Sequence, residues 1–214
     1  MRPAAVLFDF DGVLADSRLA ITRSLNFALA AVGAEERPPA ELERWIGPPL
    51  LHAFRALAGP SRAEAAVAAY RERYRVASLA ETVAVPGMPG VVAMAGSAVP
   101  VAVATSKPRV LVLPLLERLG YSASLDAVEG PSMDPSLAED KAVTVARALA
   151  ALGLSPGAGA ILVGDRSHDA DAARANGIRC TGVLWGIGDE DELRAAGASP
   201  IVATPAELPA ALGL

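Results

Sequence analysis

Residues 4–12 read AAVLFDFDG, an apolar run that ends in two aspartates two positions apart. An apolar run followed by Asp and Gly predicts a buried strand and then a turn. In an extended segment, residues i and i+2 point to the same side, so Asp9 and Asp11 can face one pocket at the carboxyl end of the strand. Open α/β sheets bind their ligands at that end. Taken alone, the motif is equally compatible with a solvated turn closed by Gly12, so its function depends on partners elsewhere in the chain.

Length and composition predict a globular protein with one large core. The chain has 214 residues and 52% of them are hydrophobic, which suffices for a core of about 100–150 residues and a smaller module. The chain does not open with a basic segment followed by an apolar one, and no run approaches the roughly 18 apolar residues of a membrane span. We therefore expect a soluble, cytoplasmic protein with no membrane partner.

Charge argues against nucleic acid as the main partner, because the net charge is −5 and no long basic stripe occurs. Cys180 is the only cysteine, which excludes an internal disulfide or a Cys-based zinc site and indicates a small buried side chain. An acidic chain that handles an anionic substrate needs local cations. Of 19 basic residues only Lys107 and Lys141 are lysines, and such retained lysines indicate a need for a compact ammonium. Nothing in the sequence indicates an oligomeric state.

The spacing of apolar residues divides the chain into a helical insertion and an alternating α/β part. Apolar residues recur at helical spacing after the first strand, and helical stretches continue to about residue 79 without a strand signal. From residue 86 onward, strands alternate with helices, which predicts a parallel sheet wound on both faces. The expected strands are 101–105, 125–128, 161–165, 181–184 and 201–202, and the clearest helices are 137–152 and 167–176. We thus predict a doubly wound, Rossmann-like α/β core from residues 1–15 and 86–214, with residues 16–85 inserted as a helical domain.

Three expected strands end in polar residues. The first ends in Asp9, the second in Thr105-Ser106 and the third in Gly164-Asp165, while Lys141 begins a helix between the last two. In a parallel sheet these ends lie along one edge, so the side chains can converge on one pocket. Each has a simpler reading as a helix cap, a surface charge or a turn residue. Together a carboxylate pair, a hydroxyl, an ammonium and a second acidic loop predict a site for phosphate and metal.

These motifs resemble those of a known family. Asp9-Phe10-Asp11-Gly12, the hydroxyl after Val101–Ala104, the downstream Lys141 and the loop Gly164–Asp169 look like the four ordered motifs of the haloacid dehalogenase-like superfamily. The details resemble its phosphoglycolate phosphatase-like branch. They are ATSKP at 104–108, GDRSHD at 164–169, WGIG at 185–188 and ELRAAGA at 192–198. One departure is that many relatives place the lysine in a Lys-Pro-x-Pro setting, whereas this chain has Glu139-Asp140-Lys141-Ala142, which leaves Lys107 as a fallback.

The resemblance implies a magnesium-dependent phosphatase that acts on a small phosphorylated metabolite through an aspartyl-phosphate. It makes Asp9 the nucleophile and Asp11 the general acid and base. Mg²⁺ prefers oxygen ligands, and the implied ligands are Asp9, Asp165 and the backbone carbonyl of Asp11. The implied phosphate-binding residues are Thr105, Ser106 and Lys141, with Thr105 and Lys141 also catalytic, and the supporting residues are Gly12, Gly164 and Asp169.

The substrate is expected to be chosen by the insertion, which by resemblance is a mobile cap. Arg44 and His52 flank the loop at residues 45–49 and are candidate contacts for a second anionic group; the simpler reading is that both are ordinary surface residues. Phosphoglycolate is the leading substrate expectation on resemblance. Nucleotides, sugar phosphates and pyrophosphate remain open.

Other chemistries fit the sequence less well. A dehalogenase has no need of a protonating carboxylate at Asp11, and a phosphoglucomutase-like enzyme usually shows Glu-Asp where this chain has Gly164-Asp165. A receiver-like phospho-acceptor also uses an aspartate, a hydroxyl, a lysine and magnesium, but the helical insertion and Asp11 argue against it. The chain contains neither a G-x-x-x-x-G-K-[ST] loop nor a G-x-G-x-x-G fingerprint, which argues against a nucleotide-binding module.

Overall fold

The computed structural model describes residues 2–133 and 139–214 of the chain. It divides them into two compact units. One unit comprises Met1–Asp16 and Ala84–Leu214, and the other comprises Ser17–Val83. These bounds differ by one or two residues from the expected insertion of residues 16–85. Each unit has its own buried residues and is described separately.

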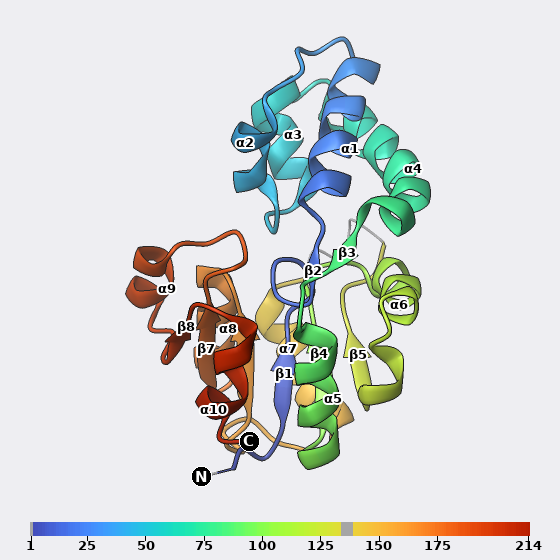
Figure 1. Cartoon of the computed structure of the whole chain (residues 1–214). Coiled ribbons are helices and arrows are strands. Elements are labelled where there is room, and N and C mark those ends of the chain that lie inside the picture. The colour runs from blue at the N-terminus through green and yellow to red at the C-terminus, as the bar shows by residue number, and fades with distance from the viewer. Residues whose placement is uncertain (1, 134–138) are drawn as a thin grey trace. The chain divides into compact units, whose positions relative to one another are not determined.

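The first unit is built on a six-stranded parallel sheet (Figure 1). Its strand order is β5-β4-β1-β6-β7-β8, which places β1 between β4 and β6. The strands are β1 (Val6–Phe8), β4 (Val101–Ala104), β5 (Ala127–Glu129), β6 (Ile161–Gly164), β7 (Arg179–Val183) and β8 (Ile201–Val202). Helices follow most strands, and this confirms the predicted doubly wound α/β class. They are α5 (Met88–Ala98), α6 (Arg109–Arg118), α7 (Lys141–Ala151), α8 (Ser167–Ala175), α9 (Glu190–Ala196) and α10 (Leu208–Leu212), with the short 3₁₀ turns η2 (Ser122–Ser124) and η4 (Pro205–Glu207).

The sheet has a hydrophobic core on each face. Because successive strand residues point to opposite faces, Val6 and Phe8 of β1 belong to one core and Leu7 to the other. The first core is completed by apolar residues of α5, α6 and α10, and the second by α7, α8 and α9. Cys180 of β7 is buried in the second core as a free cysteine, as its sequence context predicts. Burial on both faces explains why the central strands are almost entirely apolar.

The regular structure of the second unit is helical apart from its last residue, Val83, which begins the short strand β3 (Val83–Ala84). Its helices are α1 (Arg18–Ala31), α2 (Pro39–Leu42), α3 (Leu50–Ala58) and α4 (Ala63–Glu81), with the 3₁₀ turn η1 (Glu43–Trp45). Tyr70 and Tyr74 lie one turn apart on α4, and their rings stack with centroids 5.3 Å apart. Phe54 of α3 meets Tyr70 edge-on, so aromatic packing joins α3 to α4.

The observed elements differ from the expected ones mainly at their ends. The strand expected at 125–128 spans Ala127–Glu129, and the helix expected at 137–152 begins at Lys141 and ends at Ala151. Residues 137 and 138 lie outside the described residues. Two strands of two residues each, β2 (Ala15–Asp16) and β3 (Val83–Ala84), were not expected. β8 is just as short but could be expected because strands and helices alternate around it, whereas β2 and β3 border the helical insertion, where no such alternation points to a strand.

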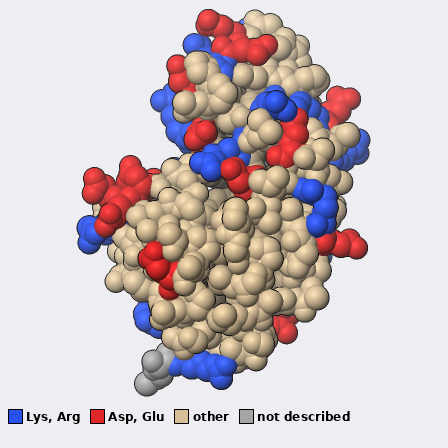
Figure 2. All heavy atoms as spheres, viewed as in Figure 1, with Lys and Arg blue, Asp and Glu red and all other residues tan. Residues whose placement is uncertain are grey.

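Acidic side chains gather over α9 on the face shown in Figure 2. The first turn of α9 contains Glu190, Asp191 and Glu192, and Asp189 caps the helix by accepting a hydrogen bond from the Glu192 amide. Negative charge is favoured there because the helix dipole is positive at its N-terminus. Among the residues that the structure describes, no helix is long and apolar enough to cross a membrane.

Candidate active site

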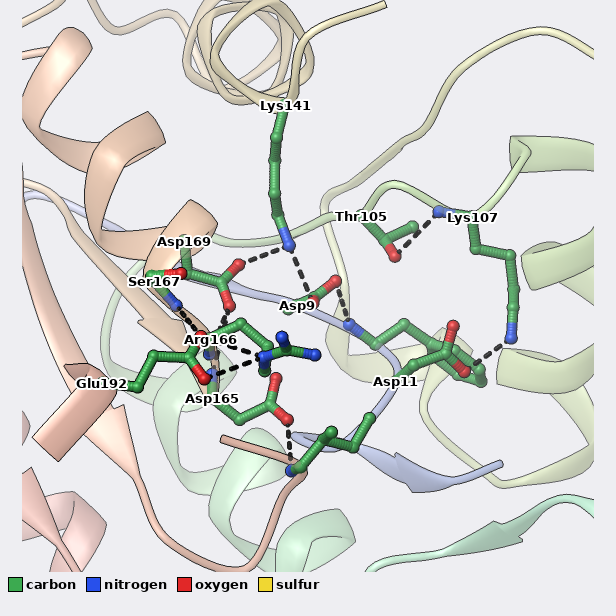
Figure 3. A network of polar contacts seen from close by, with 12 residues as sticks. Asp9, Asp11, Thr105, Lys107, Lys141, Asp165, Arg166, Ser167, Asp169 and Glu192 are labelled. Atoms are coloured by element: carbon green, nitrogen blue, oxygen red, sulfur yellow. Dashed lines mark hydrogen bonds and ion pairs between the residues drawn. The ribbon is translucent and has the colours of Figure 1, made fainter. Parts of the chain in front are cut away.

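The carboxyl ends of β1, β4 and β6 meet at one edge of the sheet (Figure 3). Asp9 directly follows β1, Thr105 follows β4 and Asp165 follows β6. Since β1 pairs with both other strands, these three side chains are neighbours although 156 positions separate the first from the last. All three are buried. The edge predicted from the sequence is therefore where the polar side chains converge.

Asp9 is held at both carboxylate oxygens. Its Oδ1 accepts a hydrogen bond of 2.7 Å from the Phe10 amide, and its Oδ2 lies 2.7 Å from Lys141 Nζ. Burial opposes ionisation of Asp9, but the Lys141 ammonium and the hydrogen bonds outweigh it, so the pKa of Asp9 is lowered. The site thus contains an oriented, ionised carboxylate, which is the form a nucleophile or a metal ligand requires.

Lys141 is the first residue of α7 and is buried. The preceding Asp140 caps this helix by accepting a hydrogen bond from the Ala142 amide, which fixes the helix start and so the origin of the Lys141 side chain. The ammonium contacts Asp169 Oδ1 as well as Asp9 Oδ2. Burial alone would lower the pKa of Lys141, but Asp169 and Asp9 raise it above its usual value. Lys141 is therefore a permanently charged bridge between two acids.

Asp169 is a structural partner at the centre of this network. It is fully buried in the first turn of α8, and its Oδ2 accepts hydrogen bonds from the amides of Asp165 (3.1 Å) and Arg166 (3.0 Å). A side chain at Gly164 would collide with Asp169, so the glycine is required for this close approach. The two ends of the GDRSHD loop are in this way tied to each other and to Lys141.

Asp11 has a different lysine as its partner. Its Oδ1 lies 2.5 Å from Lys107 Nζ, and the same ammonium lies 5.0 Å from the centroid of the Phe10 ring. A cation over an aromatic face is attracted by the ring's electrons, so Phe10 helps to hold Lys107 in place. The sequence left open whether Lys107 substitutes for Lys141. In the structure the two lysines contact different members of the Asp9–Asp11 pair.

Thr105 and Ser106 follow β4 but differ in burial. Thr105 is buried, and its Oγ1 accepts a hydrogen bond of 3.2 Å from the Lys107 amide, which leaves the hydroxyl proton to be donated to another group. Ser106 is exposed. The geometry makes Thr105 the better placed of the two predicted phosphate contacts.

The two carboxylate oxygens of Asp165 differ, because within the described part of the chain one accepts a hydrogen bond and the other does not. Its Oδ2 accepts a hydrogen bond of 2.7 Å from the Ile187 amide. Its Oδ1 is buried and has no hydrogen-bond partner among the described residues. Burial raises the pKa of Asp165 well above its usual value, and the nearby Asp169 and Asp9 carboxylates raise it further. A buried, unpartnered carboxylate oxygen close to other acids is what a bound cation satisfies.

This arrangement fits a magnesium ion on the Asp165 side of Asp9. Carboxylate oxygens are the ligands that Mg²⁺ prefers, and Asp9 and Asp165 supply them. A second grouping, Asp9, His168 and Asp169, also brings three potential ligand atoms within 4.8 Å of one another. The Lys141 ammonium, however, already contacts both Asp9 and Asp169, and a second cation there would be repelled. The Asp165 side is therefore the better metal position.

In the helical unit, the two candidate substrate contacts, Arg44 and His52, both lie near the ring of Trp45. The guanidinium carbon of Arg44 lies 5.4 Å from the Trp45 ring centroid, and the His52 ring lies 5.7 Å from it at an angle of 57°. Arg44 and His52 are both exposed. The two residues thus form a small basic and aromatic cluster around Trp45.

Sequence reasoning found most of the converging side chains but missed three features. The contact of Lys107 with Asp11 was not predicted, and neither was the position of His168 near Asp9 and Asp169. The third is the Ile187 amide, which holds Asp165 from a distant loop. In the sequence, only the motif WGIG at 185–188 pointed to that loop. The motif indicated the family and did not predict a contact with Asp165.

Comparison with known protein families decides the identity of the fold. Residues 6–183 match the model of the haloacid dehalogenase-like hydrolase family. The chain belongs to this family. The match contains the four ordered motifs, from Asp9 to Asp169, so the haloacid dehalogenase-like resemblance read from the sequence is confirmed.

Two curated relatives come from Pseudomonas aeruginosa. A protein named 5'-nucleotidase is 40% identical over 203 residues, which cover 91% of this chain and 91% of the relative. A protein named phosphoglycolate phosphatase 1 is 32% identical over 197 residues, which cover 86% of this chain and 70% of the relative. Both names describe hydrolysis of phosphate monoesters.

Two solved structures superpose well on this chain. A haloacid dehalogenase-like family hydrolase from Streptococcus pneumoniae has a TM-score of 0.91 at 26% identity, covering 97% of each chain. Protein tyrosine kinase A from Mycobacterium tuberculosis has a TM-score of 0.84 at 34% identity, covering 100% of this chain and 99% of that one. The same fold therefore carries more than one named activity.

Proposed function

We propose that this protein is a Mg²⁺-dependent phosphatase that hydrolyses a small phosphate monoester through an aspartyl-phosphate on Asp9. The chain is a hydrolase of the haloacid dehalogenase-like family, and the names of its relatives support phosphoric monoesters as its substrates. One observation carries the finer proposal. Asp9 is ionised and oriented by Phe10 and Lys141, and it interacts electrostatically with Asp165, whose buried Oδ1 has no hydrogen-bond partner among the described residues.

In the first half of the reaction an Asp9 oxygen attacks phosphorus. The new bond joins Asp9 to phosphorus, while the bond from phosphorus to the ester oxygen breaks and its electron pair leaves with the alcohol. Asp11 donates a proton to that oxygen, so that a neutral alcohol departs. Lys141 balances the negative charge of Asp9, and the Thr105 hydroxyl donates to an oxygen of the transferring group.

In the second half a water molecule attacks the phosphorus of the aspartyl-phosphate. Asp11, now ionised, accepts the proton of this water, and the bond from phosphorus to Asp9 breaks. The products are inorganic phosphate and the original Asp9 carboxylate. Asp11 thus alternates between acid and base and ends each cycle protonated, as it began.

Magnesium would be held by Asp9, Asp165 and the Asp11 backbone carbonyl. When bound, it neutralises charge that would otherwise keep the phosphate monoester and the Asp9 carboxylate apart. Asp169 supports this site indirectly, because it fixes the amide groups at Asp165 and Arg166 and the Lys141 ammonium.

Two substrate classes have specific support. Nucleoside 5'-monophosphates are favoured by the relative named 5'-nucleotidase, which is 40% identical and aligned over 91% of both chains. Phosphoglycolate, the first expectation from the sequence, is favoured by the relative named phosphoglycolate phosphatase 1 at 32% identity. The higher identity and the fuller coverage make the nucleotide the first substrate to test. Sugar phosphates and pyrophosphate belong in the same panel, and the cytoplasmic location stays a prediction.

A phosphoryl-transfer activity is the main competitor, since a solved structure named as a protein tyrosine kinase is 34% identical to this chain. A kinase would move phosphate from a nucleotide to a protein hydroxyl, whereas a phosphatase passes it to water. The phosphoglucomutase-like and receiver-like readings likewise lack release of inorganic phosphate as their main product. Release of phosphate to water is therefore the property that separates the proposal from all three.

The test is to measure inorganic phosphate released from p-nitrophenyl phosphate, nucleoside monophosphates and phosphoglycolate, each with and without Mg²⁺. We expect sustained turnover that requires Mg²⁺ and is lost in Asp9→Asn. Stoichiometric phosphorylation without turnover would instead support a phospho-acceptor, and transfer from ATP to a tyrosine peptide would support a kinase. A phosphoglycolate rate far below that of a nucleotide would remove the first substrate expectation and leave the mechanism standing.

A further inference from the structure

The segment Trp185–Gly188, which follows β7, encloses Asp165. The Ile187 amide donates a hydrogen bond of 2.7 Å to Asp165 Oδ2. A Cβ atom at Gly186 would overlap Asp165 Cγ and Oδ2, and a Cβ atom at Gly188 would overlap the Asp165 carbonyl oxygen. On another side, a Cβ atom at Gly12 would overlap Asp165 Oδ2 as well. Asp165 is thus packed between two glycine-bearing turns.

Glycine is needed at position 186 because Asp165 leaves no room for a side chain, and not because of an unusual backbone conformation. Gly12 has φ of +82°, a conformation that other residues rarely adopt. Gly186 is not among the residues with positive φ in the structure. The backbone conformation at position 186 does not require glycine. The requirement comes from Asp165, which any side chain at this position would displace.

The segment Trp185–Gly188 and the helix α9 that follows it are together fixed to both of the loops that carry proposed metal ligands. The Trp185 indole Nε1 donates a hydrogen bond of 3.1 Å to the Val13 carbonyl, in the turn that follows Asp11. Further along, Glu192 of α9 accepts hydrogen bonds from the Ser167 amide at 2.7 Å and from Arg166 Nε at 2.9 Å. Residues 185–192 therefore link the first acidic motif to the GDRSHD loop.

We propose that Gly186 and Trp185 are positioning residues that hold Asp165 in the orientation needed for magnesium. Ile187 occupies Oδ2, and close packing at Gly12 and Gly186 stops the carboxylate from turning, so Oδ1 is the oxygen left for a cation. This inference rests on the proposed Mg²⁺-dependent function, because it assigns the WGIG motif to the ligand geometry of that site. Residues that orient a metal ligand typically change metal affinity about 10–100-fold when they are altered.

The experiment is isothermal titration calorimetry of Mg²⁺ into the full chain, without substrate. Gly186→Ala should weaken Mg²⁺ binding by about tenfold or more. Gly90→Ala is the matched control, since Gly90 lies in α5 without positive φ and a Cβ atom added there would meet nothing within 4 Å. This control should bind Mg²⁺ as the unaltered protein does. If Gly186→Ala binds Mg²⁺ with an affinity within about twofold of that of the unaltered protein, the proposal is wrong. Substitution of a residue that orients a metal ligand normally changes metal affinity far more.

Two further variants keep the result interpretable. Asp165→Asn tests the metal site itself: if it binds Mg²⁺ normally, the proposed magnesium site is wrong, whereas loss of binding there with normal binding in Gly186→Ala refutes only the positioning role. If circular dichroism shows that Gly186→Ala does not fold, Trp185→Phe tests the positioning role in its place. It keeps an aromatic ring but removes the donor to Val13. Weaker Mg²⁺ binding in this variant supports the positioning role, and unchanged binding contradicts it.

Discussion

The Lys141 ammonium lies 2.7 Å from Asp9 Oδ2, and both side chains are buried. Lys107 makes the corresponding contact with Asp11, at 2.5 Å. Each acid of the DxD motif therefore has its own lysine. The two lysines of this arginine-rich chain differ in what they hold, and their substitution should have different consequences for the reaction.

Replacing Lys141 should damage both stability and catalysis. Lys141→Met leaves Asp9 and Asp169 buried without their cation, and breaking a buried pair in this way costs about 3–5 kcal/mol of unfolding free energy. We expect kcat to fall by about 10²–10³-fold as well, because the charge opposite the nucleophile is lost. Chemical denaturation and phosphatase assays measure the two effects. Arg174→Met is the control, because its ion pair with Asp171 is exposed and should change stability little. Normal turnover in Lys141→Met would contradict the assignment.

Replacing Lys107 should lower kcat/KM by an amount that depends on the leaving group of the substrate. Lys107 contacts the side chain of Asp11, the proposed proton donor to the departing oxygen, and a misplaced proton donor would slow only reactions that need the proton. We expect Lys107→Met to lower kcat/KM for an alkyl phosphate by about 10–100-fold. For p-nitrophenyl phosphate, whose leaving group is a stable anion, kcat/KM should change much less. An equal loss for both substrates would show that Lys107 acts elsewhere in the reaction.

Magnesium removal should abolish activity reversibly. Dialysis against a chelator would remove the cation that Asp9 and Asp165 are proposed to hold, and the substrate phosphate would then meet uncompensated negative charge. Adding Mg²⁺ should restore turnover. Ca²⁺ should not, because it takes more ligands at longer distances. Unchanged phosphate release in the chelated protein would argue against a metal-dependent reaction.

The cluster around Trp45 should affect substrate choice and leave the chemistry intact. Arg44→Ala and His52→Ala should raise KM for substrates with a second anionic or aromatic group, with kcat little changed. They should have little effect on p-nitrophenyl phosphate. Arg55→Ala, an exposed arginine of α3, is the matched control. If all substrates respond to Arg44→Ala and Arg55→Ala alike, the cluster has no role in recognition.

The sequence was sufficient for the fold class and for the residues that converge at the sheet edge. Parallel strands bring their carboxyl ends to one edge, so Asp9, Thr105 and Asp165 could be placed together from strand order alone. Side-chain directions could not be predicted in the same way. Whether a lysine reaches Asp9 or Asp11 depends on the start of α7 and on the Phe10 ring, which only tertiary packing fixes.

Contacts made by backbone groups were also beyond prediction. The Ile187 amide that holds Asp165 belongs to a loop 22 residues further along the chain, and any residue type but proline would supply the same donor. The strands β2 and β3 were missed because they border the helical insertion, where no alternation of strands and helices points to them.

The aspartyl-phosphate on Asp9 is the central claim, and it is tested most directly in Asp11→Asn. Without its acid and base, this variant should turn over about 10²–10⁴-fold more slowly, and the phosphorylated enzyme should accumulate because its hydrolysis needs Asp11. The measurement is mass spectrometry of peptides from Asp11→Asn quenched in acid after mixing with Mg²⁺ and p-nitrophenyl phosphate. We predict one phosphoryl group on the peptide that contains Asp9, and none in the Asp9→Asn, Asp11→Asn double variant. Substrate cleavage with no phosphoryl group on Asp9, or with the group on another residue, would contradict the mechanism.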